Sequence, residues 1–309
     1  MSLIKDDYLK KSKAVSMMKK KKGSIAAVDE EELIEDLKIE ILALLNSDKF
    51  KIPMLPSVAQ ELMQVIDSKE VDFDKVATII KKDQFLGAKL LKIANSPVYK
   101  SRYPAGKIED AVRRLGLEEV KRLLFMISMS HFVVKKGTFA NMFQDFWKHS
   151  IVAAESAKQI SRILKVDPSY AYIAGLLHDI GRTFVLMALE EMSKKTGDSS
   201  FFHEAILLKL TKDIHVDAGN IISQKWRLPG SIETSIKYHH NIARAKKEQI
   251  PLIVYVSEKL ANYYGFGDEE NVSSLENEPS LYFLGFDVEK IELLDAKLKN
   301  VFENIEELT

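Results

Sequence analysis

Cysteine is absent from this sequence. Its absence excludes disulfides, thiolate metal sites, iron–sulfur clusters and a cysteine nucleophile. Glycine and proline are sparse, at 13 and 8 of 309 residues, which favours long helices over many short strands. An excess of one charge is missing too, because 45 Lys and Arg balance 45 Asp and Glu. The chain therefore exerts no general attraction on nucleic acid or an anionic membrane.

Long apolar runs are also lacking. The longest candidate, residues 123–134, contains two serines and His131 and stays below the ~20 residues that a membrane span needs. The N-terminus has lysines but no apolar segment followed by a small-residue cleavage site, so we expect no secretory signal. With 46% hydrophobic and 29% charged residues, the composition is that of an ordinary globular protein. We expect a cytoplasmic protein without a membrane partner.

The chain divides where its pattern changes. The first residues are rich in lysine, and a solvated, disordered tail is the simplest interpretation. A partner-binding or membrane-surface arm is the alternative, but no aromatic or amphipathic face supports it. The expected divisions are a basic tail (1–28), an N-terminal helix (29–51), a main domain (52–245) with a first part (52–138) and a second part (139–245), and C-terminal helices packed on that second part (246–309).

Apolar residues recur at helical spacing along most of the chain, with short breaks. No convincing alternating strand is present, so the sequence predicts an all-α fold. The aromatic residues Phe85, Tyr99 and Phe125 fall at apolar helical positions and are interpreted as core. The expected helices of the main domain and beyond cover residues 58–66, 73–81, 84–94, 108–115, 118–134, 142–164, 168–187, 202–212, 215–226, 231–239, 251–264 and 288–308.

Histidines gather in the second part of the main domain. His178 and Asp179 end an apolar run, where such a pair is costly unless a metal ion, the backbone or an arginine partners it. His239 and His240 form another adjacent pair, with side chains about 100° apart on a helix. A single histidine is more often a core or surface residue than a ligand. Several on successive helices, with His149 and His215, point to a His/carboxylate metal site in a helical bundle.

The segment Leu176-Leu-His-Asp-Ile-Gly-Arg182 resembles the signature of the HD superfamily of metal-dependent phosphohydrolases. Over residues 52–245 the chain resembles the HDOD domain, the HD-related output domain of bacterial signalling proteins. This resemblance implies a multi-helix HDOD fold with an N-terminal helical subdomain and an HD-like bundle, acting in signalling rather than catalysis. Its further motifs are Leu55-Pro-Ser-Val-Ala59, Ile79-Ile-Lys-Lys-Asp83, Ala88-Lys-Leu-Leu-Lys-Ile-Ala-Asn-Ser96, and Ile108-Glu-Asp-Ala-Val112 through Leu115-Gly116.

The resemblance to two-metal HD enzymes also implies a ligand set, which is fuller here than in a degenerate HD domain. Glu258 stands where those enzymes have an aspartate, and its side chain is one methylene longer. A dinuclear centre would share Asp179 between its two metals. The first metal would take His149, His178, Asp179 and Glu258, and the second would take His215, His239, His240 and Asp179. Nitrogen and oxygen ligands without sulfur suit iron, manganese or zinc.

Other residues near these motifs have two interpretations each. Arg182 stands four residues after His178, where HD hydrolases often have a lysine that contacts phosphate; pairing with an aspartate or exposure at the surface is the alternative. Asp145 either orients His149 or faces solvent. His131 and His203 have no motif context and are interpreted as structural. The Gly-Tyr-Pro segment of the HD-GYP enzymes is missing after the His-His pair, which argues against cyclic di-GMP hydrolysis by that route.

Two functions stay open at this point. One is a signalling module that binds a partner protein or a small phosphorylated ligand and keeps a divalent metal in a structural or sensory site. The other is an active metal-dependent phosphohydrolase on a nucleotide or phosphoester, with Arg182 on the phosphate. A nucleic-acid regulator is a third class, and it rests only on the lysine-rich tail.

Overall fold

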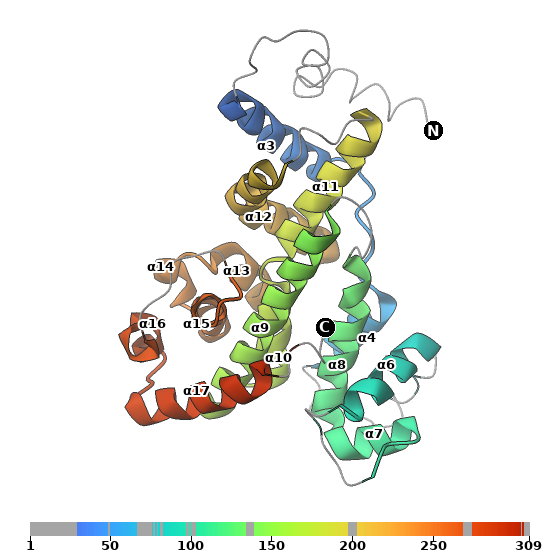
Figure 1. The fold of residues 1–309 in the computed structure, drawn as a ribbon, viewed down its shortest axis with the longest axis vertical. Coiled ribbons are helices and arrows are strands. Elements are labelled where there is room, and N and C mark those ends of the chain that lie inside the picture. The colour runs from blue at the N-terminus through green and yellow to red at the C-terminus, as the bar shows by residue number, and fades with distance from the viewer. Residues whose placement is uncertain are drawn as a thin grey trace. The chain divides into compact units, whose positions relative to one another are not determined.

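The computed structural model describes residues 30–48, 50–66, 76, 78, 80, 83–96, 99, 103–133, 139–196, 203–267, 274–303 and 305. Every element in these residues is helical, and they contain no strand (Figure 1). The prediction of an all-α fold is confirmed. The tail at 1–28 and most of the helix expected at 73–81 lie outside the described residues, and the domain boundaries stay predictions.

The chain forms two compact units, each assembled from separate segments. The first unit comprises Met1–Pro53, Val134–Phe143 and Asp179–Leu228 and contains α3 (Glu30–Asn46), α11 (Ile180–Thr196) and α12 (Glu204–Trp226). The second unit comprises Met54–Val133, Gln144–His178 and Pro229–Thr309. Its helices are α4 (Ser57–Ile66), α6 (Gln84–Ala94), α7 (Ile108–Leu115), α8 (Leu117–Met129), most of α9 (Ala140–Leu164), α10 (Pro168–Leu177), α13 (Gly230–Tyr238), α14 (Ile242–Ala245), α15 (Gln249–Tyr263), α16 (Pro279–Phe283) and α17 (Val288–Phe302), with the short turns η2 (Ser130–Phe132) and η3 (Leu275–Asn277).

In the first unit, α3, α11 and α12 pack against one another. The C-terminal end of α12 is fixed by polar contacts to the chain around α3. The indole of Trp226 donates to the carbonyl of Pro53 over 3.0 Å, and Lys225 Nζ donates to the carbonyl of Leu45 over 2.8 Å. The Trp226 ring also meets Phe184 of α11 edge to face, with centroids 5.4 Å apart.

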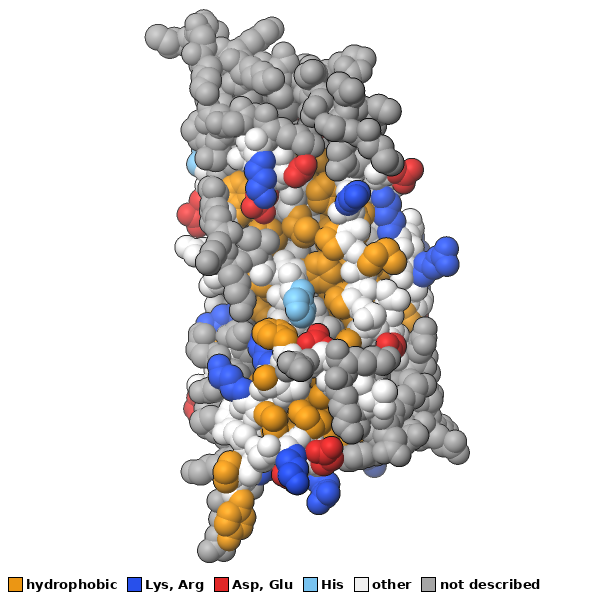
Figure 2. All heavy atoms as spheres, turned by 90° about the vertical axis from the view of Figure 1, so that its right-hand side faces the viewer, with side chains coloured by type: hydrophobic (Ala, Val, Ile, Leu, Met, Phe, Trp, Pro, Cys, Tyr) orange, Lys and Arg blue, Asp and Glu red, His pale blue; other side chains and the backbone are white. Residues whose placement is uncertain are grey.

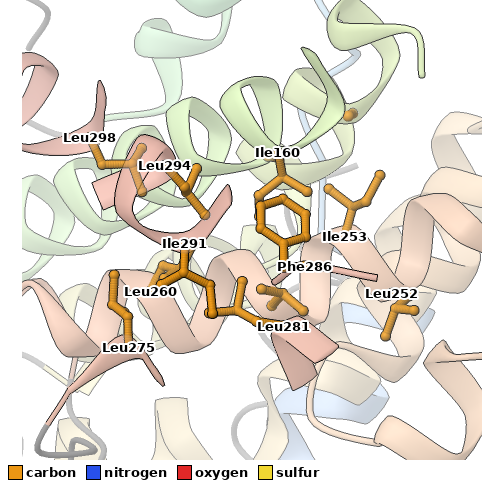
Figure 3. Close-up of a cluster of buried hydrophobic side chains, with 13 residues drawn as sticks. Ile160, Leu252, Ile253, Leu260, Leu275, Leu281, Phe286, Ile291, Leu294 and Leu298 are labelled. Atoms are coloured by element: carbon orange, nitrogen blue, oxygen red, sulfur yellow. The ribbon is translucent and has the colours of Figure 1, made fainter. Parts of the chain in front are cut away.

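In the second unit, a buried apolar cluster lies between α9, α15, α16 and α17 (Figure 3). Ile160 of α9 and Phe286 point toward each other, and Ile253 and Leu260 come from one face of α15. Burying one such side chain fully is worth about 1.5–3 kcal/mol, so this cluster fixes the rotation of α15 about its axis. The opposite face of α15 is thereby available to the polar residues described below.

A buried charge network connects α8 with α9 in the same unit. Arg122 of α8 is 2% exposed, and its guanidinium pairs with Glu119 and Glu155. It also lies over the ring of Tyr172 in α10, 4.5 Å from the centroid. Lys158 of α9 pairs with Glu155 and lies 3.7 Å from Glu119. Each buried charge in this network therefore has an opposite charge beside it.

Most expected helices are present, and several differ in their bounds. The helix expected at 118–134 is shorter, because α8 ends at Met129 and the turn η2 follows it. The helix expected at 168–187 is interrupted at His178 and Asp179, so that α10 ends and α11 begins there. The helices expected at 202–212 and 215–226 form the single helix α12. The closing helix α17 ends at Phe302 rather than near 308.

Core assignments are confirmed for Phe125, which is fully buried, and wrong for Phe85, which is 53% exposed on α6; Tyr99 is half-buried. Among the described residues, one stretch, Pro168–Lys194, which covers α10 and most of α11, is long and apolar enough to cross a membrane by length and composition alone. However, 89% of its most apolar window is buried inside the protein, as core helices commonly are.

On the face in Figure 2, acidic and basic side chains of the described residues are interspersed with hydrophobic ones.

Candidate metal centre

The second unit brings five of the seven predicted ligands together. They come from distant parts of the sequence: His149 from α9, His178 from the end of α10, His239 and His240 from the end of α13, and Glu258 from α15. Packing of α15 against α10, α13 and α14 places the ends of α10 and α13 beside the helix that carries Glu258.

The closest group consists of His149, His178 and Glu258. Glu258 Oε2 lies 2.8 Å from His149 Nε2 and 3.0 Å from His178 Nε2, and the two nitrogens are 3.2 Å apart. The ring of His239 meets that of His178 edge to face with centroids 4.9 Å apart, and the His240 ring is 4.2 Å from that of His239. His240 is exposed, whereas the other four side chains are buried.

Backbone carbonyls orient the buried histidines. Nδ1 of His149 lies 2.7 Å from the Phe266 carbonyl oxygen, and Nδ1 of His178 lies 2.6 Å from that of Gly175. Nδ1 of His239 lies 2.8 Å from the Ile236 carbonyl oxygen. A carbonyl oxygen only accepts, so each Nδ1 must carry a proton. In a neutral imidazole Nε2 then keeps the lone pair, and Nε2 is the atom that faces the other ligands.

Three acceptors thus converge in a buried place: two imidazole nitrogens and one carboxylate oxygen. Acceptors about 3 Å apart repel one another unless a proton or a metal ion lies between them. Burial raises the pKa of the Glu258 carboxyl, but the positive charge of a protonated His149 and hydrogen bonds donated by protonated His149 and His178 lower it by more. The Glu258 carboxylate is therefore stabilised by positive charge at this place, which either a proton on the imidazoles or a metal ion supplies.

The remaining two predicted ligands meet in the first unit. His215 Nε2 lies 3.4 Å from Asp179 Oδ1, and both residues are buried. Nδ1 of His215 donates to the Lys212 carbonyl over 2.8 Å, so Nε2 again faces the carboxylate. The other oxygen, Asp179 Oδ2, forms an ion pair with Arg182 and lies 2.7 Å from Nε. Arg182 is itself only 4% exposed and is paired with Asp179, the alternative interpretation of its sequence position.

Two glycines allow the close helix contacts on which these groups depend. A Cβ on Gly181 of α11 would overlap the carbonyl oxygen of His215 in α12. A Cβ on Gly175 of α10 would lie 2.9 Å from the Cα of Ala154 in α9, which is closer than real Cβ contacts. Glycine at these positions therefore lets Asp179 approach His215, and His178 approach His149.

The other residues singled out in the sequence lie elsewhere. Asp145 is exposed on α9, as expected of a solvated helix face. His131 is exposed, and its ring lies against Phe85. His203 precedes α12 and lies 3.6 Å from Glu30. Asn262 was not identified from the sequence, although its Nδ2 donates to Glu258 Oε1 over 3.1 Å. It follows Glu258 by four residues, a spacing that places both side chains on the same face of a helix.

The donor chemistry of both groups fits a divalent metal. The set in the second unit offers imidazole Nε2 atoms and a carboxylate oxygen, and the set in the first unit offers one imidazole Nε2 and a carboxylate oxygen. The sequence has no cysteine to add sulfur. Such ligands suit iron, manganese and zinc. The His178–Asp179 peptide bond joins the two sets covalently.

The chain belongs to the HDOD domain family, because the model of this family matches residues 52–242. A similar solved structure is an HDOD domain protein of unknown function from Geobacter sulfurreducens, at 25% identity and a TM-score of 0.70, covering 88% of this chain and 99% of that one. A proposed metal-dependent phosphohydrolase from Shewanella amazonensis shares the fold at 20% identity, with a TM-score of 0.61, over 86% of this chain and 99% of that one.

A curated relative is ribonuclease Y of Ureaplasma parvum, 24% identical over 209 residues. The match covers 66% of this chain but only 33% of that relative. The chain therefore spans about a third of the length of the ribonuclease.

Proposed function

We propose that this protein is a metal-binding HDOD signalling module of the cytoplasm, which recognises a partner protein or a small phosphorylated ligand. The observation that carries the proposal is the convergence of His149 Nε2, His178 Nε2 and Glu258 Oε2 within 3.2 Å, with each Nδ1 committed to a backbone carbonyl. Acceptors oriented in this way form a cation site.

The assignment of the metals remains the one that the resemblance implies from the sequence. His149, His178 and Glu258, with Asp179, would hold one ion, while His215, His239 and His240, with Asp179, would hold a second. A bound divalent ion supplies positive charge that polarises and orients a phosphoryl oxygen. Backbone carbonyls fix which nitrogen of each buried imidazole is available, and all the proposed ligand residues except the exposed His240 are buried.

Arg182 favours the module over the enzyme. Its pairing with Asp179 Oδ2 leaves Oδ1 as the oxygen that faces His215. A carboxylate bridging two metals would share that single oxygen or give up the arginine, and an arginine tied to a ligand is not free to move onto a substrate phosphate. The active phosphohydrolase stays the second candidate, because the full set of ligand residues is present and a ribonuclease is among the relatives.

Elemental analysis of protein purified without chelator or nickel resin tests the proposal. We expect about one to two equivalents of iron, manganese or zinc per chain, reduced in His178→Ala and in His239→Ala. Asp145→Ala, at an exposed position on the helix that carries His149, is the control and should retain the metal. Metal content at background in the wild type, even after reconstitution, would overturn the metal site.

Turnover separates the two candidates. The metal-loaded protein should leave bis(p-nitrophenyl) phosphate and short RNA intact, with no hydrolysis above the protein-free control. Hydrolysis that is abolished by His178→Ala would instead establish the phosphohydrolase and reject the non-catalytic module.

A further inference from the structure

Glu258 presents only one of its two carboxylate oxygens to the histidines. Oε2 faces His149 and His178, whereas Oε1 accepts from Nδ2 of Asn262 over 3.1 Å. Asn262 follows one turn later on α15, and it is 2% exposed. The same Nδ2 also donates to the backbone carbonyl of Glu258 over 3.0 Å. An amide nitrogen has two hydrogens, so Asn262 can donate to both of these oxygens of Glu258.

A glycine in the loop after α15 leaves room for this amide. A Cβ on Gly267 would overlap Oδ1 of Asn262 and lie 2.6 Å from its Cγ. Gly267 therefore supplies the space that the amide occupies while its nitrogen points at Glu258. The requirement at this position is one of space.

The same loop also orients a histidine. Gly265, with a φ of 81°, turns the chain at the end of α15. The next residue, Phe266, presents the carbonyl that accepts from His149 Nδ1 over 2.7 Å. Phe266 is fixed in turn by Lys148, whose ammonium lies 5.6 Å from the ring centroid, and by the ring of Phe302 at 5.8 Å. One short loop thus supports both the carboxylate and an imidazole of the cluster.

We propose that Asn262 and Gly267 are positioning residues that make Glu258 a ligand through a single oxygen. The inference rests on the proposed metal site. It adds the two residues that orient Glu258, whose side chain is one methylene longer than the aspartate found at this position in the enzymes that the sequence resembles. A glutamate has one more rotatable bond, and fixing it costs conformational entropy. The two hydrogen bonds from Asn262 remove that freedom in advance, and they direct Oε2 rather than Oε1 toward the nitrogens.

Zinc affinity, measured by competition with a chromophoric chelator, tests the proposal in a double-mutant cycle. Asn262→Leu should weaken zinc binding by about 10–100-fold, the usual effect of losing a partner that orients a ligand. The shorter side chain of Glu258→Asp places its carboxylate away from the Asn262 amide. Adding Asn262→Leu to Glu258→Asp should therefore change the affinity by less than about threefold, because coupling exists only between interacting residues.

Gly267→Ala tests the same contact without changing Asn262 and should weaken zinc binding in the same direction. Gly285→Ala is the matched control, because Gly285 has a φ of 75° and nothing within 4 Å of an added Cβ. This control should lower the melting temperature and leave the zinc affinity unchanged.

The outcomes separate the two proposals. Equal zinc affinity in the wild type and in Asn262→Leu would overturn the positioning role and leave the metal site intact. If Asn262→Leu weakened zinc binding equally in the wild type and in the Glu258→Asp variant, the effect would be a general structural one, and the positioning role would again be rejected. Failure of the wild type to bind any metal would overturn the proposed function first, and this inference with it.

Discussion

At the scale of single residues, the candidate site is defined by which atom each side chain presents. Three of the four buried histidines take their orientation from a carbonyl three residues earlier in the chain: Gly175 for His178, Lys212 for His215 and Ile236 for His239. Each helix therefore sets the tautomer of its own histidine. His149 differs, since its carbonyl comes from a distant loop.

The adjacent histidines His239 and His240 should contribute unequally. His239 is fully buried and oriented by the Ile236 carbonyl, whereas His240 is exposed. We expect His239→Ala to weaken zinc binding by at least about tenfold and His240→Ala by clearly less, because water replaces an exposed ligand more readily than a buried one. Zinc titration of both variants measures the difference. A larger loss in His240→Ala would contradict this ranking.

The sequence identified the candidate ligand residues but not the contacts that orient them. Motif spacing identifies His178, Asp179 and the His239–His240 pair, since each is a side chain whose chemistry is visible in the sequence. Phe266 contributes a backbone carbonyl, and Gly267 contributes the space that the Asn262 amide occupies. Neither contact can be predicted from residue type or periodicity, because each depends on how the loop after α15 folds.

At the scale of elements, helix prediction succeeded where caps were visible. The helices α6 and α7 have the predicted bounds, the first with an Asp83 N-cap and the second ending at Gly116 with a φ of 78°. Residues 168–196 contain no proline after the first turn, so the sequence predicts a single helix over 168–187 even though His178 and Asp179 end an apolar run. There the backbone N–H of Arg182 donates to the Asp179 carbonyl in the first turn of α11.

Close helix crossings make glycine substitutions a sensitive probe of these elements. Gly181→Ala would force its Cβ onto the backbone of His215, so we expect a loss of about 3 kcal/mol or more in the free energy of unfolding. Gly175→Ala meets Ala154 less severely and should cost less, about 1–3 kcal/mol. Urea denaturation measures both. Gly230→Ala, with nothing within 4 Å of an added Cβ, is the control and should be nearly neutral.

The charge network between α8 and α9 should give the protein an acid sensitivity. Burial raises the pKa of Glu119, but attraction to Arg122 and then to Lys158 outweighs it, and the pKa lies well below its ordinary value. The carboxyl therefore stays ionised in the folded protein, while it takes up a proton at about pH 4.3 in the unfolded chain. Its contribution to stability is complete above that pH and is lost as the pH falls toward the folded pKa.

The expected result is a free energy of unfolding that falls below about pH 4.5 and falls less steeply in Glu119→Gln. Urea denaturation between about pH 3 and 6 provides the measurement. Glu289→Gln, at an exposed position of α17, is the control and should keep the wild-type pH dependence. Identical slopes in the wild type and Glu119→Gln would show that Glu119 does not carry the effect.

At the scale of the whole molecule, metal binding should appear as stability. A ligand that binds only the folded state at 100 times its Kd adds about 2.7 kcal/mol, which corresponds to a rise in Tm of about 4 °C for a chain of this size. Adding a chelator should therefore lower the Tm of the wild-type protein. Chelator should lower the Tm of His178→Ala by less, since that variant has lost a central ligand of one of the two proposed ions. A chelator effect of equal size in both proteins would contradict the assignment.

The two tryptophans give this chain a built-in pair of optical reporters. Trp226, held by the Pro53 carbonyl and Phe184, belongs to the first unit, and Trp147 of α9 belongs to the second. Replacing either one by phenylalanine leaves emission from a single unit. Unfolding followed separately in Trp147→Phe and Trp226→Phe then reveals whether the two units melt together or in sequence, because coincident transitions from different probes are the signature of a single cooperative step.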